Sequence, residues 1–186
     1  MCGEIPDYCY RSTLVNRVND TGSAMRTDTE MDFAVANYRH FIVEHCCDCL
    51  VSGYLIVSPV IPVLSLAGLS REAQEALGPV LAAAAETVQT VIAPIKIYCA
   101  QFGEEGQHLH FHVFPRSAEI TTEYLRAFPE QRDLIHGPLL LDWARSRYRV
   151  PKSEVWRAVA PAIERWRAEF HRIAGRATEQ VEARRR

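Results

Sequence analysis

A segment of alternating polar and apolar side chains, residues 108–114, constrains this chain more than any other part of the sequence. Its polar positions are three histidines at every second residue: His108, His110 and His112. The residues between and after them are apolar: Leu109, Phe111 and Val113. Successive side chains of a β-strand point to opposite faces, so a strand here carries three imidazoles on one face, about 6–7 Å apart. Because the other face is apolar, the segment predicts a strand that covers a core and exposes a chemically active surface.

Three aligned imidazoles are suited to three kinds of chemistry. Their neutral nitrogens can bind a metal, protonated imidazoles can bind an anion, and one imidazole can act as a nucleophile beside neighbours that offset charge. A cupin-type metal site needs an acid three or four residues after its His-x-His pair. Those positions hold Phe114, Pro115 and Arg116, and the first acid is Glu119. A metal-dependent enzyme that uses the triad as ligands is therefore the weaker alternative.

The rest of the pattern predicts an α+β fold. Apolar residues at three-four spacing after Ser70 predict a long helix over residues 70–92, in which Pro79 marks either a kink or the start of the regular part. The strand candidates are residues 33–36, 38–43, 53–57, 95–100 and 108–114. This order of strands, helix, hairpin and further helices is typical of a sheet with helices on one side.

Three regions follow from this pattern. Residues 1–30 are polar and contain turn residues, so they are predicted to be an N-terminal extension with disordered parts. Residues 31–119 form the expected catalytic domain, and residues 120–186 a helical C-terminal extension. In this extension, apolar residues share one helix face: Trp156, Val159, Ile163, Trp166, Phe170 and Ile173. We expect this face to pack on the domain or on a partner subunit.

Composition excludes several classes of function. The formal net charge of −2 supplies no strong positive field, so a nucleic-acid partner is not expected. Residues 50–70 carry no charge, but Pro59 and Pro62 interrupt them, so we expect a buried strand and a loop and no membrane span. The first ten residues contain two acids and no apolar run. We therefore expect a cytoplasmic protein whose six cysteines are reduced.

The triad segment resembles the signature of the histidine triad (HIT) superfamily, in which histidines alternate with apolar residues and two apolar residues follow. Residues 53–59, Gly-Tyr-Leu-Ile-Val-Ser-Pro, resemble the family's Gly-His-φ-φ-φ-x-Pro strand. The resemblance covers residues 32–117. It implies an antiparallel five-stranded sheet with a long helix, usually in a homodimer, and a nucleotide or nucleotide conjugate as ligand.

The resemblance also implies roles for the three histidines. The middle one, His110, would attack the α-phosphate of a nucleotide and form a covalent nucleotidyl-histidine, which is then transferred to water or another acceptor. His108 would orient His110, and His112 would contact phosphate oxygens. The expected function is a nucleotide hydrolase or nucleotidyl transferase that requires no cofactor. A nucleotide-binding module with little catalysis is the first alternative.

Two departures from the family pattern concern the expected substrate-binding residues, which are Tyr54, Gly103, Glu104, Glu105, Gln107 and Arg116. Tyr54 stands where the family has a fourth histidine; it can reach the triad through its hydroxyl but is not a cation at pH 7. Glu104 and Glu105 stand where the family has Gln and a Ser or Thr, and acids near a phosphate repel a polyanion. Cys46 and Cys49 have the local spacing of a structural zinc pair, but a second such pair is absent, so buried thiols are expected.

Overall fold

The computed structural model describes residues 31–102 and 108–183, and the side chains up to residue 176. The chain divides into two units, Met1–Asp32 and Phe33–Arg186. The second unit contains every element considered below, including the helical C-terminal extension. The N-terminal extension and the loop of residues 103–107 lie outside the described residues.

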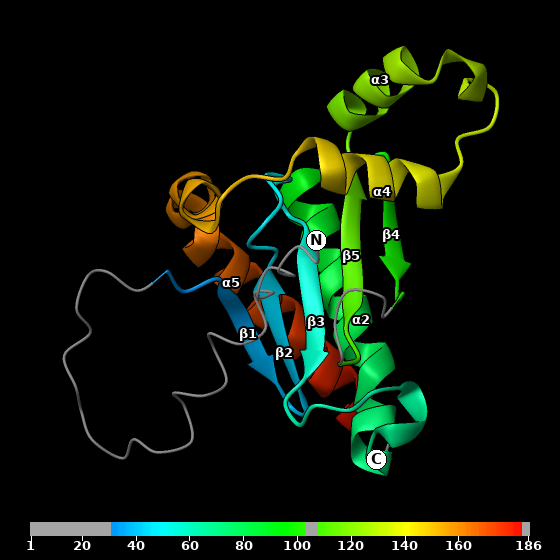
Figure 1. Ribbon diagram of the computed structural model, residues 1–186. Coiled ribbons are helices and arrows are strands. Elements are labelled where there is room, and N and C mark those ends of the chain that lie inside the picture. Colours follow the sequence, from blue (N-terminus) through cyan, green and yellow to red (C-terminus); the bar gives the residue numbers. More distant parts are fainter. Residues whose placement is uncertain (1–30, 103–107, 184–186) are drawn as a thin grey trace, which may run out of the picture. The chain divides into compact units, whose positions relative to one another are not determined.

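The second unit is built on one antiparallel sheet with the strand order β1-β2-β3-β5-β4 (Figure 1). The predicted α+β class with a five-stranded antiparallel sheet is therefore confirmed. Because β5 lies between β3 and β4, the triad segment enters the interior of the sheet. The strands are β1 (Ala34–Tyr38), β2 (Phe41–His45), β3 (Leu55–Pro59), β4 (Lys96–Ala100) and β5 (Phe111–Arg116).

The last strand is shorter than the alternation predicts. β5 begins at Phe111 rather than at His108, because its pairing with β3 ends at Val57 and its pairing with β4 ends at Ala100. Before Phe111, the Leu109 amide instead donates a hydrogen bond to the carbonyl of Val63, at 2.7 Å, in the loop that follows β3. Two of the three histidines therefore precede the strand, although the alternation of buried and less buried side chains continues through them.

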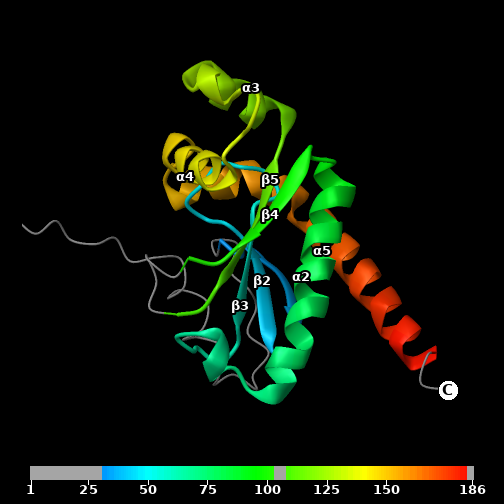
Figure 2. The same cartoon turned by 90° about the vertical axis from the view of Figure 1, so that its right-hand side faces the viewer.

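Two long helices cover one face of the sheet (Figure 2). Helix α2 (Arg71–Ile92) contacts β2, β3, β4 and β5, and α5 (Lys152–Ala183) contacts β1 and α2. The Ser70 hydroxyl caps α2 by accepting a hydrogen bond from the Ala73 amide. Pro79 lies within this helix, eight residues after its start, without ending it. The apolar stripe of α5 packs within this chain, where Trp166 and Phe170 are buried.

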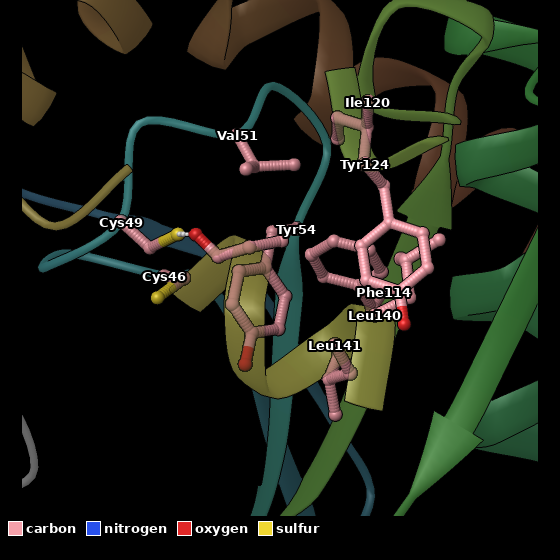
Figure 3. Packing of buried hydrophobic residues seen from close by; sticks show 10 residues of the cluster. Cys46, Cys49, Val51, Tyr54, Phe114, Ile120, Tyr124, Leu140 and Leu141 are labelled. Atoms are coloured by element: carbon pink, nitrogen blue, oxygen red, sulfur yellow. Dashed lines mark hydrogen bonds between the residues drawn. The ribbon is translucent and has the colours of Figure 1, made fainter. Parts of the chain in front are cut away.

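Shorter helices lie on the opposite face of the sheet, where Figure 2 shows α4 across from α2. Three elements follow β5: helix α3 (Ala118–Ala127), the turn η2 (Pro129–Gln131) and helix α4 (Gly137–Arg147). A further turn, η1 (Leu66–Gly68), precedes α2. Helices α3 and α4 enclose a second apolar cluster (Figure 3). Its buried members come from three segments: Cys46, Cys49, Val51 and Tyr54 near β2 and β3, Phe114 of β5, and Ile120, Tyr124, Leu140, Leu141 and Ala144 of α3 and α4.

The connection between β2 and β3 joins the sheet to α5. Gly53 has a φ of +78°, and its amide donates a 3.1 Å hydrogen bond to Nε2 of His45. Nδ1 of the same imidazole donates to the Cys46 carbonyl at 2.8 Å. The Trp166 indole lies edge-on to this imidazole, with ring centroids 6.4 Å apart. His45 is therefore a buried, neutral ring whose two nitrogens both have partners.

We predict that acid destabilises the fold through His45. Burial lowers the pKa of His45 from 6.5 to about 4. Between these two values the unfolded chain binds a proton that the folded chain does not, so the free energy of unfolding falls as the pH falls. The loss should be about 2 kcal/mol between pH 7.5 and pH 5.0, since each pKa unit corresponds to roughly 1.4 kcal/mol.

Urea unfolding at the two pH values measures this loss. An exposed-histidine variant, His171→Ala, should keep the same dependence on pH, whereas His45→Gln should lose most of it while being less stable at pH 7.5. An equal urea midpoint at pH 7.5 and pH 5.0 for the unchanged protein would contradict the assignment.

We also predict that Gly53→Ala is strongly destabilising. A Cβ at this position would lie 2.6 Å from the Trp166 ring and 2.8 Å from the Ile92 side chain, in a backbone conformation that L residues rarely adopt. The combined cost should be about 2–4 kcal/mol. Gly175→Ala in α5, whose added Cβ meets nothing within 4 Å, should be neutral or slightly stabilising in the same thermal unfolding measurement. Equal melting temperatures for the two variants would refute the prediction.

Candidate active site

The imidazoles of His110 and His112 lie side by side at the beginning of β5. Their ring centroids are 4.8 Å apart and the rings are nearly perpendicular, at 78°. His110 is partly exposed, whereas only 4% of the surface of His112 is exposed. Because Phe111 and Val113 alternate with them, these imidazoles belong to the face of the sheet that α2 does not cover. The predicted juxtaposition on one face is thus present for this pair.

The hydrogen bond of His110 decides which of its nitrogens is reactive. Nδ1 lies 3.0 Å from the main-chain carbonyl of His108. A carbonyl oxygen can only accept, so Nδ1 carries the proton and, in the neutral ring, Nε2 carries the lone pair. A partly exposed imidazole with its lone pair on the nitrogen remote from the backbone is suited to nucleophilic attack.

His108 is connected to the site through its backbone. It is partly buried and precedes β5, and its carbonyl is the group that holds Nδ1 of His110. The resemblance implies an orienting role for this residue, and the structure shows an orienting contact that does not involve its imidazole. Side-chain replacement at this position therefore leaves that particular contact in place.

His112 is held from behind by Tyr54. The Tyr54 hydroxyl lies 2.7 Å from Nδ1 of His112, and both side chains are buried. Burial raises the pKa of Tyr54 well above its usual value of 10, so the phenol stays protonated. Tyr54 was expected among the substrate-binding residues. It is fully buried and its hydroxyl lies against His112, so a contact between Tyr54 and substrate stays a prediction.

Arg116 does not join the triad. It is four residues beyond His112 in β5, which corresponds to about 13 Å along a strand. Its Nη1 donates to the Tyr98 hydroxyl at 3.2 Å, and its guanidinium lies over the Tyr98 ring. The expectation that Arg116 binds the same ligand stays a prediction, and its described contacts are with Tyr98. The other expected binding residues, Gly103, Glu104, Glu105 and Gln107, lie outside the described residues.

Phe102 is a neighbour of the triad that sequence reasoning missed. Its ring centroid is 6.0 Å from that of His112, and 46% of its surface is exposed. On the other side of β5, the loop after β3 approaches the triad through the bond between Leu109 and Val63. This loop exposes large apolar side chains: Val60, Ile61, Leu64 and Leu66. The loop after β3 therefore runs beside the triad segment, and the absence of charge over residues 50–70 was its signal in the sequence.

Cys46 and Cys49 are buried near β2, and their surroundings favour neutral thiols. Burial raises the pKa of Cys46 well above its usual value and that of Cys49 to about 12. The Cys46 thiol donates to Asp48 at 2.9 Å, and both nitrogens of His45 are already engaged. In the part of the chain that the structure describes, no three or more His, Cys, Asp or Glu residues lie together in an arrangement that could hold a metal ion.

Three cysteines can be compared with the expectation of reduced thiols. Cys46, Cys49 and Cys99 are free thiols, as expected from the sequence. Cys2 and Cys9 lie outside the described residues.

The uncharged residues 50–70 were expected to form a strand and a loop rather than a membrane span. Within residues 31–102 and 108–183, none of the helices combines the length and the apolar character needed to span a membrane. The uncharged residues 50–70 instead form β3, its flanking loops and the turn η1.

Comparison with known proteins identifies similar structures but no similar sequences. No protein-family model matches the sequence, and no curated protein is significantly similar to it. A HIT-like protein from Bartonella henselae, described as involved in cell-cycle regulation, is 22% identical over 47% of this chain and 68% of its own, with a TM-score of 0.42. A histidine triad protein from Bradyrhizobium japonicum is 18% identical over 46% of this chain and 64% of its own, with a TM-score of 0.41.

One match extends into the C-terminal region. A zinc-bound histidine triad family protein from Mycobacterium smegmatis is 14% identical over 77% of this chain and 87% of its own, with a TM-score of 0.47. All three are described as histidine triad or HIT-like proteins. Because the identities are low and the TM-scores lie below 0.5, the roles of the histidines in this chain rest on the hydrogen bonds described above.

Proposed function

We propose that this protein is a nucleotide hydrolase or nucleotidyl transferase that acts at a nucleotide α-phosphate through a covalent intermediate on His110. The observation that carries the proposal is the bond from Nδ1 of His110 to the His108 carbonyl, which leaves the lone pair on Nε2. The neighbouring imidazole of His112 supports it, since a phosphate held by this nucleophile would lie within reach of a second ring.

The reaction then follows in two steps. Nε2 of His110 donates its lone pair to the α-phosphorus, a P–N bond forms, and the bond to the leaving group breaks with its electron pair going to that group, which takes up a proton. Water or another acceptor then attacks the same phosphorus. The P–N bond breaks, its electron pair returns to Nε2, and the proton of the attacking hydroxyl is released to solvent. Hydrogen bonds from the triad offset the charge that develops on the phosphate oxygens.

We predict that His110→Ala abolishes the intermediate. Intact-mass measurement after brief exposure to a panel of nucleotide phosphoramidates and dinucleoside polyphosphates should show a nucleotidyl adduct on the unchanged protein and none on the variant. Turnover should fall about a thousand-fold or more, as expected on loss of a nucleophile. His171→Ala, which removes an exposed histidine of α5, should behave like the unchanged protein. Normal turnover by a folded His110→Ala variant would exclude the proposal.

The same experiment separates the two alternatives. Tight nucleotide binding without an adduct or turnover across the whole panel would indicate a binding module. A metal bound in stoichiometric amount to the purified protein and lost in His110→Ala would indicate a metal-dependent enzyme that uses the triad as ligands. The adduct, in contrast, identifies the base and the mechanism together.

The homodimer and the cytoplasmic location remain predictions from the resemblance and the sequence. β4 is one of the two edge strands of the sheet and exposes Lys96 and Cys99, so it offers a place for self-association. Light scattering during size-exclusion chromatography should give twice the chain mass of 21.1 kDa. A single species at 21.1 kDa over micromolar concentrations would rule out a stable dimer.

A further inference from the structure

The contact between Tyr54 and His112 determines more than the position of an imidazole. The two atoms are 2.7 Å apart and buried, and within the described residues this is the hydrogen bond that the phenol makes. Such a bond can run in either direction, because a hydroxyl and an imidazole nitrogen can each donate or accept. The direction decides which nitrogen of His112 carries the proton in the neutral ring.

The surroundings of Tyr54 assign the phenol as the donor. Burial keeps it protonated, as its raised pKa indicates. A buried O–H that donates to nothing is costly, and Nδ1 of His112 is the acceptor within reach. With the phenol proton on that bond, Nδ1 holds a lone pair, and a neutral His112 carries its proton on Nε2, at the edge of the ring away from Tyr54.

We propose that Tyr54 is a positioning residue that donates to Nδ1 of His112 and so fixes the proton of the neutral ring on Nε2, which makes this ring a hydrogen-bond donor in the reaction at His110. This inference rests on the proposed function. The two neighbouring rings then have complementary roles: His110 presents a lone pair on Nε2, because a carbonyl takes its Nδ1 proton, and His112 presents a proton on Nε2, because a hydroxyl donates to its Nδ1.

The backbone on both sides fixes Tyr54 in place. Its amide donates to the Val51 carbonyl at 3.1 Å, and its carbonyl accepts from the Cys46 amide at 2.7 Å. The residue before it is Gly53, whose conformation and contact with Trp166 are described above. The phenol therefore has little freedom to follow His112 if that ring moves, which is the property that a positioning group needs.

The C-terminal extension supports the phenol from the other side. The Tyr54 ring meets Phe114 edge-on at 5.1 Å and belongs to the buried cluster that includes Leu140 and Leu141 of α4 (Figure 3). The helices after β5 thus contribute to the site through this packing. They hold the group that orients His112.

Nitrogen NMR on the full-length protein tests the proton assignment without any substrate. With ¹⁵N-labelled histidine at pH 8, His112 should show a protonated Nε2 and an unprotonated, hydrogen-bonded Nδ1. Tyr54→Phe, which removes only the hydroxyl, should shift the Nδ1 resonance to that of a free acceptor and leave His110 unchanged. Tyr124→Phe is the matched control, since it removes a hydroxyl of the same cluster that bonds to Gln131 instead.

Two NMR outcomes would overturn the inference. A proton on Nδ1 of His112 in the unchanged protein would mean that the phenol is the acceptor. An Nδ1 resonance that is the same in Tyr54→Phe and in the unchanged protein would mean that the hydroxyl does not act on the ring. The first measurement needs no variant, so it decides the point even if Tyr54→Phe folds poorly.

Kinetics then separate this inference from the proposed function. Formation of the nucleotidyl adduct should slow about 10- to 100-fold in Tyr54→Phe, as is usual for loss of a group that orients a reactive residue, with nucleotide affinity changed less than threefold. Tyr124→Phe should react at the normal rate. An unchanged rate in Tyr54→Phe would reject the positioning role and leave the proposed function intact. If the unchanged protein forms no adduct, the proposed function fails and so does the role toward phosphate, whatever the NMR result.

Discussion

The hydrogen bond from the Gly53 amide to His45, made in a turn with positive φ, is the constraint on which most of this structure depends. It lets the chain return from β2 into β3 with space for the Trp166 ring directly against the glycine. The same turn delivers Tyr54 to the opposite side, where it meets His112. One connection therefore links α5, the sheet and the triad, and a side chain added there would disturb all three.

The two faces of the sheet differ in what packs against them. On one face, α2 and α5 bury the apolar side chains of the strands, and this packing stabilises the sheet. On the other, the helices after β5 cover part of the surface, and His110 and His112 lie at the beginning of β5. Among the described residues, a buried partner such as Tyr54 and a partly exposed ring such as His110 are thus both neighbours of His112.

Two buried histidines illustrate how the fold sets protonation. His45 donates to a carbonyl and accepts from an amide, so its partners require a neutral ring and burial lowers its pKa. His112 accepts from a phenol at Nδ1, by our inference, so its neutral ring carries the proton on Nε2. The same kind of side chain is a structural element in one case and a candidate site residue in the other, because His45 is enclosed by the connection between β2 and β3 whereas His112 lies beside the partly exposed His110.

The sequence alone determined the class of fold, the long helix after Ser70 and the face shared by His110 and His112, because these depend on short-range periodicity. It also indicated that Tyr54 could reach the triad through its hydroxyl. Only the tertiary structure decided that β5 starts at Phe111, that Arg116 turns to Tyr98 and that Phe102 approaches His112. These depend on where neighbouring strands stop pairing and which side chains meet across the sheet, and such contacts between distant parts of the chain leave no local pattern in the sequence.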